Sequence, residues 1–89
     1  MRIKLELFGA SRDFSDKDYL NLELQYKASI NDLRNEIIKY LYKNFQGNEN
    51  FIKIVKSSAF CSENNKMISD NYKITKDQKI GIIPPIGGG

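Results

Sequence analysis

Residues 80–89 read Ile-Gly-Ile-Ile-Pro-Pro-Ile-Gly-Gly-Gly, and the rest of the chain is organised around this stretch. The first four residues form a short apolar run of the kind found in buried strands. The two prolines hold φ at about −65° and favour an extended exit from that strand. The three glycines have no Cβ and can therefore pass through a narrow slot. We expect a folded domain over residues 1–83 and an extended, flexible tail over residues 84–89.

The N-terminal part contains two stretches in which apolar and polar residues alternate. Residues 2–8 place three aliphatic side chains on one face and put Phe8 among charged residues on the other. Residues 19–25 repeat the alternation, with three leucines facing inward. Residues 9–16, which lie between them, are small and polar and are expected to form a loop or short turn. This order predicts an antiparallel hairpin with a long connection.

The period then changes to that of a helix. Ser29 is a suitable N-cap, and Asp32 three residues later completes a variant of the capping box. A helix is predicted over residues 30–45, ending before Gly47, because apolar side chains recur at helical spacing. They are Ile30, Leu33, Ile37, Leu41 and Phe45, with Ile38 and Tyr42 widening the stripe.

The second half of the sequence predicts two or three further strands. Residues 46–56 are compatible with either a helical or an extended segment. Residues 58–61 indicate a strand, residues 67–68 a short return strand, and residues 80–83 the closing strand. The order strand, strand, helix, strand, strand is typical of an α+β fold with one main helix across one face of a mixed sheet. With the last strand beside the first, this is the β-grasp, or ubiquitin-like, fold.

The alternation also predicts which side chains leave the core. Ile80 and Ile82 should point inward, whereas Gly81 and Ile83 should point to the uncovered face of the sheet. If the first and last strands adjoin, Phe8 and Ile83 form an apolar patch at the root of the tail. Isolated surface hydrophobic residues are common, but the position beside the tail favours a docking surface.

Composition excludes several classes of function. Eighty-nine residues with 40% hydrophobic content form one small domain, and the net charge of +3 comes from scattered lysines. Nucleic-acid and membrane partners are therefore not expected, and no apolar run is long enough to span a bilayer. The chain has no histidine and a single cysteine, Cys61, so that neither a metal site nor a nucleophile–base pair is expected. We interpret Cys61 as a small buried hydrophobic residue in a cytoplasmic protein.

Two motifs resemble those of a known family. Residues 8–13 read Phe-Gly-Ala-Ser-Arg-Asp and are similar to the Phe-Ala-x-x-Arg-Glu pattern that ends the first strand in the small subunit of molybdopterin synthase, one of the ubiquitin-like sulfur carriers. Residues 84–89 match the diproline, aliphatic, small residue and Gly-Gly ending of that family. Residues 76–79, Lys-Asp-Gln-Lys, depart from the acidic turn that the family often has.

The resemblance implies a function and a set of residues. In the family, an E1-like adenylyltransferase uses ATP to adenylate the terminal glycine, and a sulfur donor converts it to a thiocarboxylate. The thiocarboxylate enters the large molybdopterin synthase subunit, in a heterotetramer, and supplies the sulfur of the dithiolene. The chain itself binds no cofactor. By this resemblance Gly89 carries the sulfur, and the residues that contact partners are Gly88, Gly87, Ile86, Pro85, Pro84, Ile83, Phe8, Arg12 and Met67.

Three alternatives remain open at this stage. The nearest is a sulfur carrier for the thiazole of thiamine or for cysteine synthesis, although thiamine-type carriers are usually shorter and lack the diproline. The second is a ubiquitin-like modifier that is joined to lysines through Gly89. The third is a basic module that binds RNA, whose binding would fall steeply with salt and would survive deletion of the tail.

Overall fold

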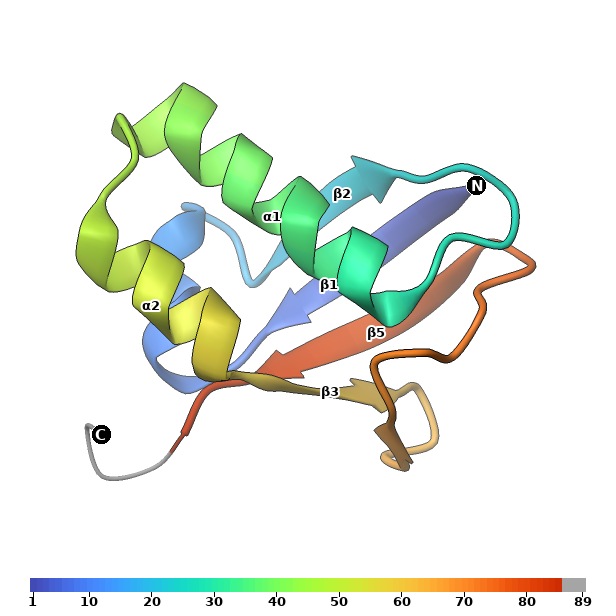
Figure 1. Ribbon diagram of the computed structural model, residues 1–89. Coiled ribbons are helices and arrows are strands. Elements are labelled where there is room, and N and C mark those ends of the chain that lie inside the picture. The colour runs from blue at the N-terminus through green and yellow to red at the C-terminus, as the bar shows by residue number, and fades with distance from the viewer. Residues whose placement is uncertain (86–89) are drawn as a thin grey trace.

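The computed structural model describes residues 1–85, which form a five-stranded mixed sheet with helices on one face (Figure 1). The strand order is β2 (Tyr19–Glu23), β1 (Arg2–Leu7), β5 (Gln78–Ile83), β3 (Ala59–Ser62) and β4 (Met67–Ile68). β1 and β5 pair in parallel, and the other neighbouring pairs are antiparallel. The closing strand therefore lies beside the first strand, and the predicted β-grasp fold is confirmed.

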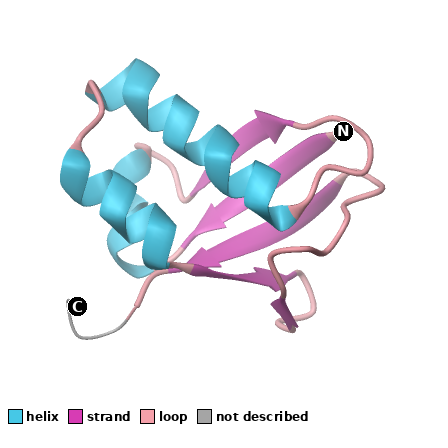
Figure 2. Ribbon diagram, viewed as in Figure 1, coloured by secondary structure: helices cyan, strands magenta, loops and turns pink. Residues whose placement is uncertain are grey.

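Three helical segments cover one face of this sheet. They are the 3-10 helix η1 (Gly9–Phe14), α1 (Ile30–Phe45) and α2 (Glu49–Ser57), which Figure 2 distinguishes from the strands. α1 crosses the sheet, and α2 lies beside it near the end at which the chain leaves β5 (Figure 1). None of the helices within residues 1–85 combines the length and apolar character needed to cross a bilayer.

The core lies between α1 and the sheet. Alternate residues of β1 and β5 face it, because side chains alternate between the two faces of a strand. On α1 the fully buried positions are those of the predicted stripe, except that Ile38 and Phe45 are half-buried and Tyr42 is 63% exposed. The core residues with no exposed surface are Ile3, Leu5, Phe14, Ile30, Leu33, Ile37, Leu41, Val55, Ile74, Ile80 and Ile82.

The N-terminus of α1 has the predicted capping box. The backbone N–H of Asp32 donates to Ser29 Oγ at 3.1 Å, and the backbone N–H of Ser29 donates to Asp32 Oδ2 at 2.9 Å. At the other end Gln46 adopts the left-handed conformation and Gly47 follows with φ of 71°. The predicted bounds of this helix are confirmed.

The stretch that the sequence left open, residues 46–56, contains helix α2. The side chain of Asn48 caps it by accepting a hydrogen bond from the backbone N–H of Phe51 at 3.1 Å. α2 buries Ile52 and Val55, and the ring of Phe51 lies 5.1 Å from that of Phe14. An amphipathic helix therefore replaces the extended alternative for this segment.

The connection after β1 is more ordered than the predicted loop. It forms η1, in which Ser11 and Phe14 are buried. The hydroxyl of Ser11 donates to the carbonyl oxygen of Phe8 at 2.6 Å, and the ring of Phe14 fills the space beneath α2. One buried aromatic residue therefore converts a polar connection into part of the covering layer.

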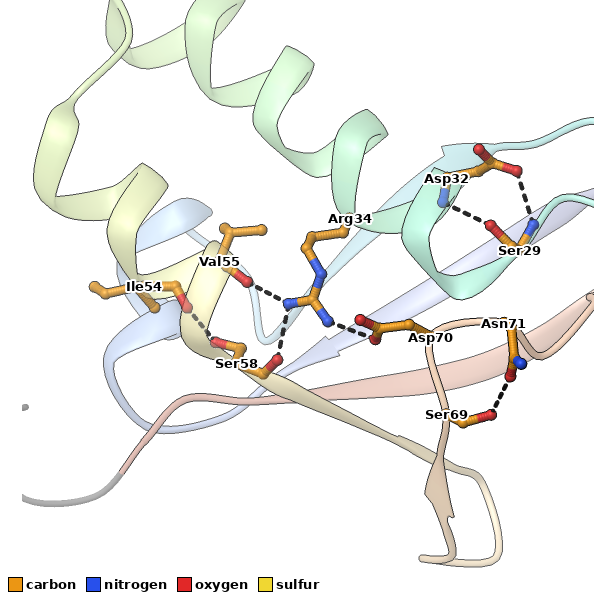
Figure 3. A network of polar contacts seen from close by, with 9 residues as sticks. All are labelled: Ser29, Asp32, Arg34, Ile54, Val55, Ser58, Ser69, Asp70 and Asn71. Carbon is orange, nitrogen blue, oxygen red and sulfur yellow. Dashed lines mark hydrogen bonds and ion pairs between the residues drawn. The ribbon is translucent and has the colours of Figure 1, made fainter.

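Arg34 joins several of these elements (Figure 3). Its Nη1 donates to the carbonyl oxygens of Val55 and Ser58, at 2.6 and 2.8 Å, and so satisfies acceptors at the C-terminus of α2. Its Nη2 pairs with Asp70 at 2.8 Å, and its guanidinium lies 4.9 Å from the centre of the Phe60 ring. With these contacts the Arg34 side chain is only 12% exposed.

Several strand bounds differ from the predicted ones by one or two residues. β1 ends at Leu7 because Phe8 is the N-cap of η1, although Phe8 keeps an extended backbone (φ −118°, ψ 151°). β2 ends at Glu23, β3 is shifted to residues 59–62 because α2 precedes it, and β5 begins earlier, at Gln78. The short return strand at residues 67–68 is confirmed as β4.

Candidate functional site

The face of the sheet away from the helices, here called the open face, carries an apolar patch. The register places Gly81 of β5 beside Cys61 of β3, and Cys61 beside Met67 of β4, so that all three belong to this face. In the next row Ile83 pairs with Ala59. Together with Phe8, which follows β1 on the same face, these residues form a continuous region that we call the open-face patch.

Phe8 lies directly over Gly81. A Cβ built on Gly81 would lie 2.8 Å from Cε2 of Phe8 and 2.9 Å from Sγ of Cys61, closer than real Cβ contacts allow. Glycine is therefore required for the ring to rest on the central strand. Phe8 itself remains 37% exposed, whereas Cys61 is buried with a free thiol, as its interpretation as a small buried residue predicts.

The point at which the chain leaves the sheet is fixed by the turn after β1. Gly9 has φ of 55°, a conformation that favours glycine, and a Cβ there would lie 3.9 Å from the ring of Pro84. Pro84 is buried, whereas Pro85 is exposed. The chain is therefore held against the domain at its first proline, and the second proline extends beyond it.

A hollow of about 570 Å³ lies beside this exit. It is lined by residues of η1 and α2 together with both prolines. Its apolar part comes from Ala10, Ile54, Pro84 and Pro85, and Lys53 and Lys56 are also among the lining residues. The sequence did not point to these two lysines, because the segment that contains them was left unassigned. Their spacing of three residues, which places them on one face of a helix, is the signal that could have identified them.

The other end of the open face is polar. Lys79 of β5 pairs with Glu6 of β1 at 3.2 Å, and Nζ of Lys4 lies 4.5 Å from the centre of the Tyr19 ring of β2. These contacts cross between neighbouring strands, but each leaves charged groups in contact with solvent. The apolar part of the open face is therefore confined to the end from which the chain leaves.

The predicted site residues fall into three groups. Phe8 and the half-buried Ile83 lie on the open face at the tail exit, and Met67 lies across the same face on β4 with 64% of its surface exposed. Arg12 is exposed in the last turn of η1, and its side chain makes no hydrogen bond or ion pair within residues 1–85. Ile86, Gly87, Gly88 and Gly89 lie outside the described residues.

No arrangement typical of a catalytic centre occurs in the part of the chain that the structure describes. Residues 1–85 contain no group of three or more His, Cys, Asp or Glu side chains that could hold a metal ion. Burial raises the pKa of Tyr40, with a further contribution from the charge of Asp16, but its hydroxyl donates to the carbonyl oxygen of Phe14 at 2.7 Å and ties α1 to η1. Burial is thus the main cause of the raised pKa of Tyr40, and the contact with Phe14 has a structural role. The described surface around the chain exit carries the partly exposed side chains of Phe8 and Ile83.

Solved structures share this fold. One is described as "Putative molybdopterin converting factor, subunit 1" from Pyrococcus furiosus, with a TM-score of 0.68, 19% identity, and coverage of 96% of this chain and 98% of that one. Two others are SAMP1, the small archaeal modifier protein 1, from Haloferax volcanii. The first has a TM-score of 0.68, 12% identity and full coverage of both chains. The second has a TM-score of 0.67 and 10% identity, and covers 96% of this chain and 98% of that one.

No protein-family model matches the sequence, and no curated protein is significantly similar to it. At these identities the solved structures show the fold alone. The protein has a ubiquitin-like β-grasp fold.

Proposed function

We propose that the protein is a ubiquitin-like sulfur carrier and the small subunit of a molybdopterin synthase. The observation that carries this proposal is the position of the diproline. Pro84 is buried directly after the central strand β5, so that the chain leaves the sheet beside the open-face patch. Four residues beyond Pro85 can reach at most about 14 Å. An enzyme that acts on Gly89 must therefore also contact the surface around the exit.

The proposed function requires only one reactive group from this chain, the carboxylate of its last residue. An E1-like adenylyltransferase would let the carboxylate of Gly89 attack the α-phosphate of ATP, with release of pyrophosphate. Sulfide released by a sulfur donor would then attack the carbonyl carbon of the adenylate, displace AMP and leave a thiocarboxylate. The chain supplies the carboxylate and the slender approach to it, while ATP and the catalytic groups belong to the partner. A solvent-exposed carboxylate is unreactive towards nucleophiles, so an activating partner is required.

The large synthase subunit would take up the same tail. Phe8 and Ile83 provide apolar surface at the exit, and Met67 provides it across the open face. Arg12 provides a positive charge on η1. An exposed apolar surface of this kind is suited to a protein partner. The diproline-glycine ending supports this assignment over the thiamine alternative.

A second candidate is a protein modifier joined to lysines through Gly89. The observation that favours it is the fold shared with SAMP1, which is named as a modifier protein. Both candidates begin with the same activation of the tail. They differ in the acceptor, which is a cofactor precursor in one case and a lysine amine in the other.

The deciding experiment is the intact mass of the protein purified from its own cells. A thiocarboxylate replaces one oxygen by sulfur and adds about 16 Da, and fragment masses must assign this change to Gly89, because oxidation of Met1 or Met67 adds nearly the same mass. The matched control is a chain that lacks the last two glycines. A carboxylate at Gly89 in every molecule, together with normal cofactor synthesis by the shortened control, would contradict the carrier function.

A second measurement separates the two candidates. Cells that contain a tagged chain are searched for conjugates of higher mass by denaturing electrophoresis. If the chain is a modifier, conjugates appear and are lost with the last two glycines. If it is only a carrier, no conjugates appear, and deletion of the gene abolishes the synthesis of molybdopterin.

A further inference from the structure

The outer edge of β2 presents unpaired backbone groups. β2 is the first strand in the sheet and pairs only with β1. Met1 and Leu24 exchange two backbone hydrogen bonds, at 2.6 and 2.9 Å, and the N–H of Leu7 donates to the carbonyl oxygen of Asp18 at 2.8 Å. Because bonded residues alternate along an antiparallel strand, the even-numbered residues of β2 face β1. The N–H and C=O groups that point away from the sheet belong to Tyr19, Asn21 and Glu23.

A groove lies at this edge between Leu22 of β2 and the helix α1. It has a volume of about 550 Å³. Its floor includes Leu22, whose side chain faces the core side of the sheet and is only partly buried. The opposite wall is α1, and the residues of that wall that matter here are Glu36, Lys39, Tyr40, Tyr42 and Lys43.

We propose that this edge and groove bind an extended peptide segment of a partner protein, which adds to the sheet beside β2. Donors and acceptors spaced along a strand edge are matched by another strand, which accounts for an extended peptide as the occupant. Every second side chain of that peptide then points to the helix side of the sheet, next to Leu22. These positions require aliphatic residues.

The charges of the groove specify the rest of the peptide. Lys39 and Lys43 lie four residues apart and so on one face of α1, with Glu36 as the single acidic residue of the groove. The net charge of the wall is positive, and the peptide should carry acidic residues at the end that lies below these lysines. The open-face patch is separate from this edge, because β1 lies between β2 and β5. The inference therefore does not depend on the proposed sulfur chemistry.

The test uses the full chain labelled with ¹⁵N and a capped synthetic peptide, Thr-Val-Thr-Val-Thr-Asp-Asp. On titration, we expect shifts of the amide resonances of Asn21, Glu23 and Lys39, and none at Ile83. Two N-methylated versions of the peptide sharpen the result, one modified on the threonines and the other on the valines. In a strand only one of these sets points its N–H groups at β2. One of the two methylated peptides should therefore fail to bind. The identity of that peptide shows whether the added strand is antiparallel or parallel to β2.

A proline at Asn21 tests the edge from the side of the protein. Asn21→Pro removes an N–H that points away from β1, so that the hydrogen bonds between β1 and β2 are kept. We expect the peptide to bind at least about fivefold more weakly, because one hydrogen bond is lost and the ring obstructs the approach. Asn21→Ser, which keeps the N–H, is the matched control and should bind as the unmodified chain does. If Asn21→Pro fails to fold, the N-methylated peptides still decide the question.

Variants of the two lysines test whether the groove requires acidic residues in the peptide. The double variant Lys39→Glu, Lys43→Glu should weaken binding about fivefold at low salt, and this loss should shrink as salt is added. The double variant Lys53→Glu, Lys56→Glu, on α2, is the control with an equal change of charge, and it should leave peptide binding unchanged. Equal binding of both N-methylated peptides, or no shift at millimolar peptide, would overturn the proposal. So would shifts of β2 that depend on protein concentration without peptide, because the edge would then pair with a second copy of this chain.

Discussion

The two faces of the sheet are made by the same strands and differ in almost every property. The helix-covered face carries side chains with no exposed surface, such as Leu5 and Ile80. The open face carries ion pairs at one end and the open-face patch at the other. The residues of one strand alternate between the covered face, where their burial stabilises the domain, and the open face, where they contact solvent. Substitutions at successive positions of one strand should therefore alternate between large and small effects on stability.

The largest effect is expected from the covered face. Leu5→Ala leaves a cavity between β1 and α1 and should lower the free energy of unfolding by about 3 kcal/mol. Denaturant unfolding followed by circular dichroism measures this loss. Lys4→Ala, the neighbour on the open face, is the control and should change stability by less than about 0.5 kcal/mol. Equal losses of stability in the two variants would show that the open face contributes to folding as strongly as the covered face does.

The next effect is expected at Gly81, where the open face is closely packed. Gly81→Ala places a methyl group within 2.9 Å of both Phe8 and Cys61, so the ring must move. We expect a loss of about 1–2 kcal/mol and faster reaction of Cys61 with a thiol reagent. In the double variant with Phe8→Ala the methyl group no longer meets the ring. The combined loss should then be smaller than the sum of the single losses.

Phe8→Ala alone tests whether the open-face patch serves recognition. The ring is partly exposed, so its removal should cost only about 1 kcal/mol of stability. Binding to a partner that receives the tail should fall by tenfold or more if the ring is an anchor of that interface. Isothermal titration with the E1-like enzyme from the same cell measures this. Unchanged affinity would remove Phe8 from the proposed interface.

The dependence of stability on pH tests the cap at the N-terminus of α1, which belongs to neither face of the sheet. The hydrogen bonds from the backbone and hydroxyl of Ser29 lower the pKa of Asp32 below its usual value of 3.8. A carboxyl group whose pKa is lower in the folded state stabilises the protein above its unfolded pKa. This contribution is lost as the pH falls from about 4 through the lowered value. Asp32→Asn should therefore flatten the acid branch of a plot of stability against pH, and leave the branch above pH 5 parallel to that of the unmodified chain.

The smallest effect is expected for the ion pair at the polar end of the open face. Lys79→Gln removes the contact with Glu6, but both side chains are well exposed and screened by solvent. The loss should be at most about 0.5 kcal/mol and should vanish at high salt. Thermal unfolding at two salt concentrations measures it. A loss comparable to that of Leu5→Ala would mean that the open face contributes to folding as strongly as the core does.

The sequence predicts the elements whose signals are local. The helix α1 has a complete apolar stripe and a cap at Ser29, and the alternation in β1 and β5 assigns their two faces. α2 was ambiguous because residues 51–55 are short and mix β-branched with aromatic residues. Its helical form depends on packing against Phe14, which is distant in the sequence. The same distant packing, and not local propensity, orders η1.

The candidate site was predictable only in part, for a similar reason. The pattern of alternation places Phe8 and Ile83 on the uncovered face once β1 and β5 adjoin. It does not reveal that Phe8 rests on Gly81, which depends on the register between two distant strands. Nor does it reveal the burial of Pro84, which depends on the left-handed turn at Gly9. Contacts between segments far apart in the sequence are the part that a local pattern cannot supply.

The central position of β5 has a mechanical consequence. β5 is hydrogen bonded to β1 on one side and to β3 on the other, so it cannot peel away from the sheet one strand at a time. Its amide protons should exchange with solvent only when the whole domain opens. A pull on the glycines would load two ladders at once, along the direction of the strands. The domain should thus withstand a pull on its C-terminal end and remain folded.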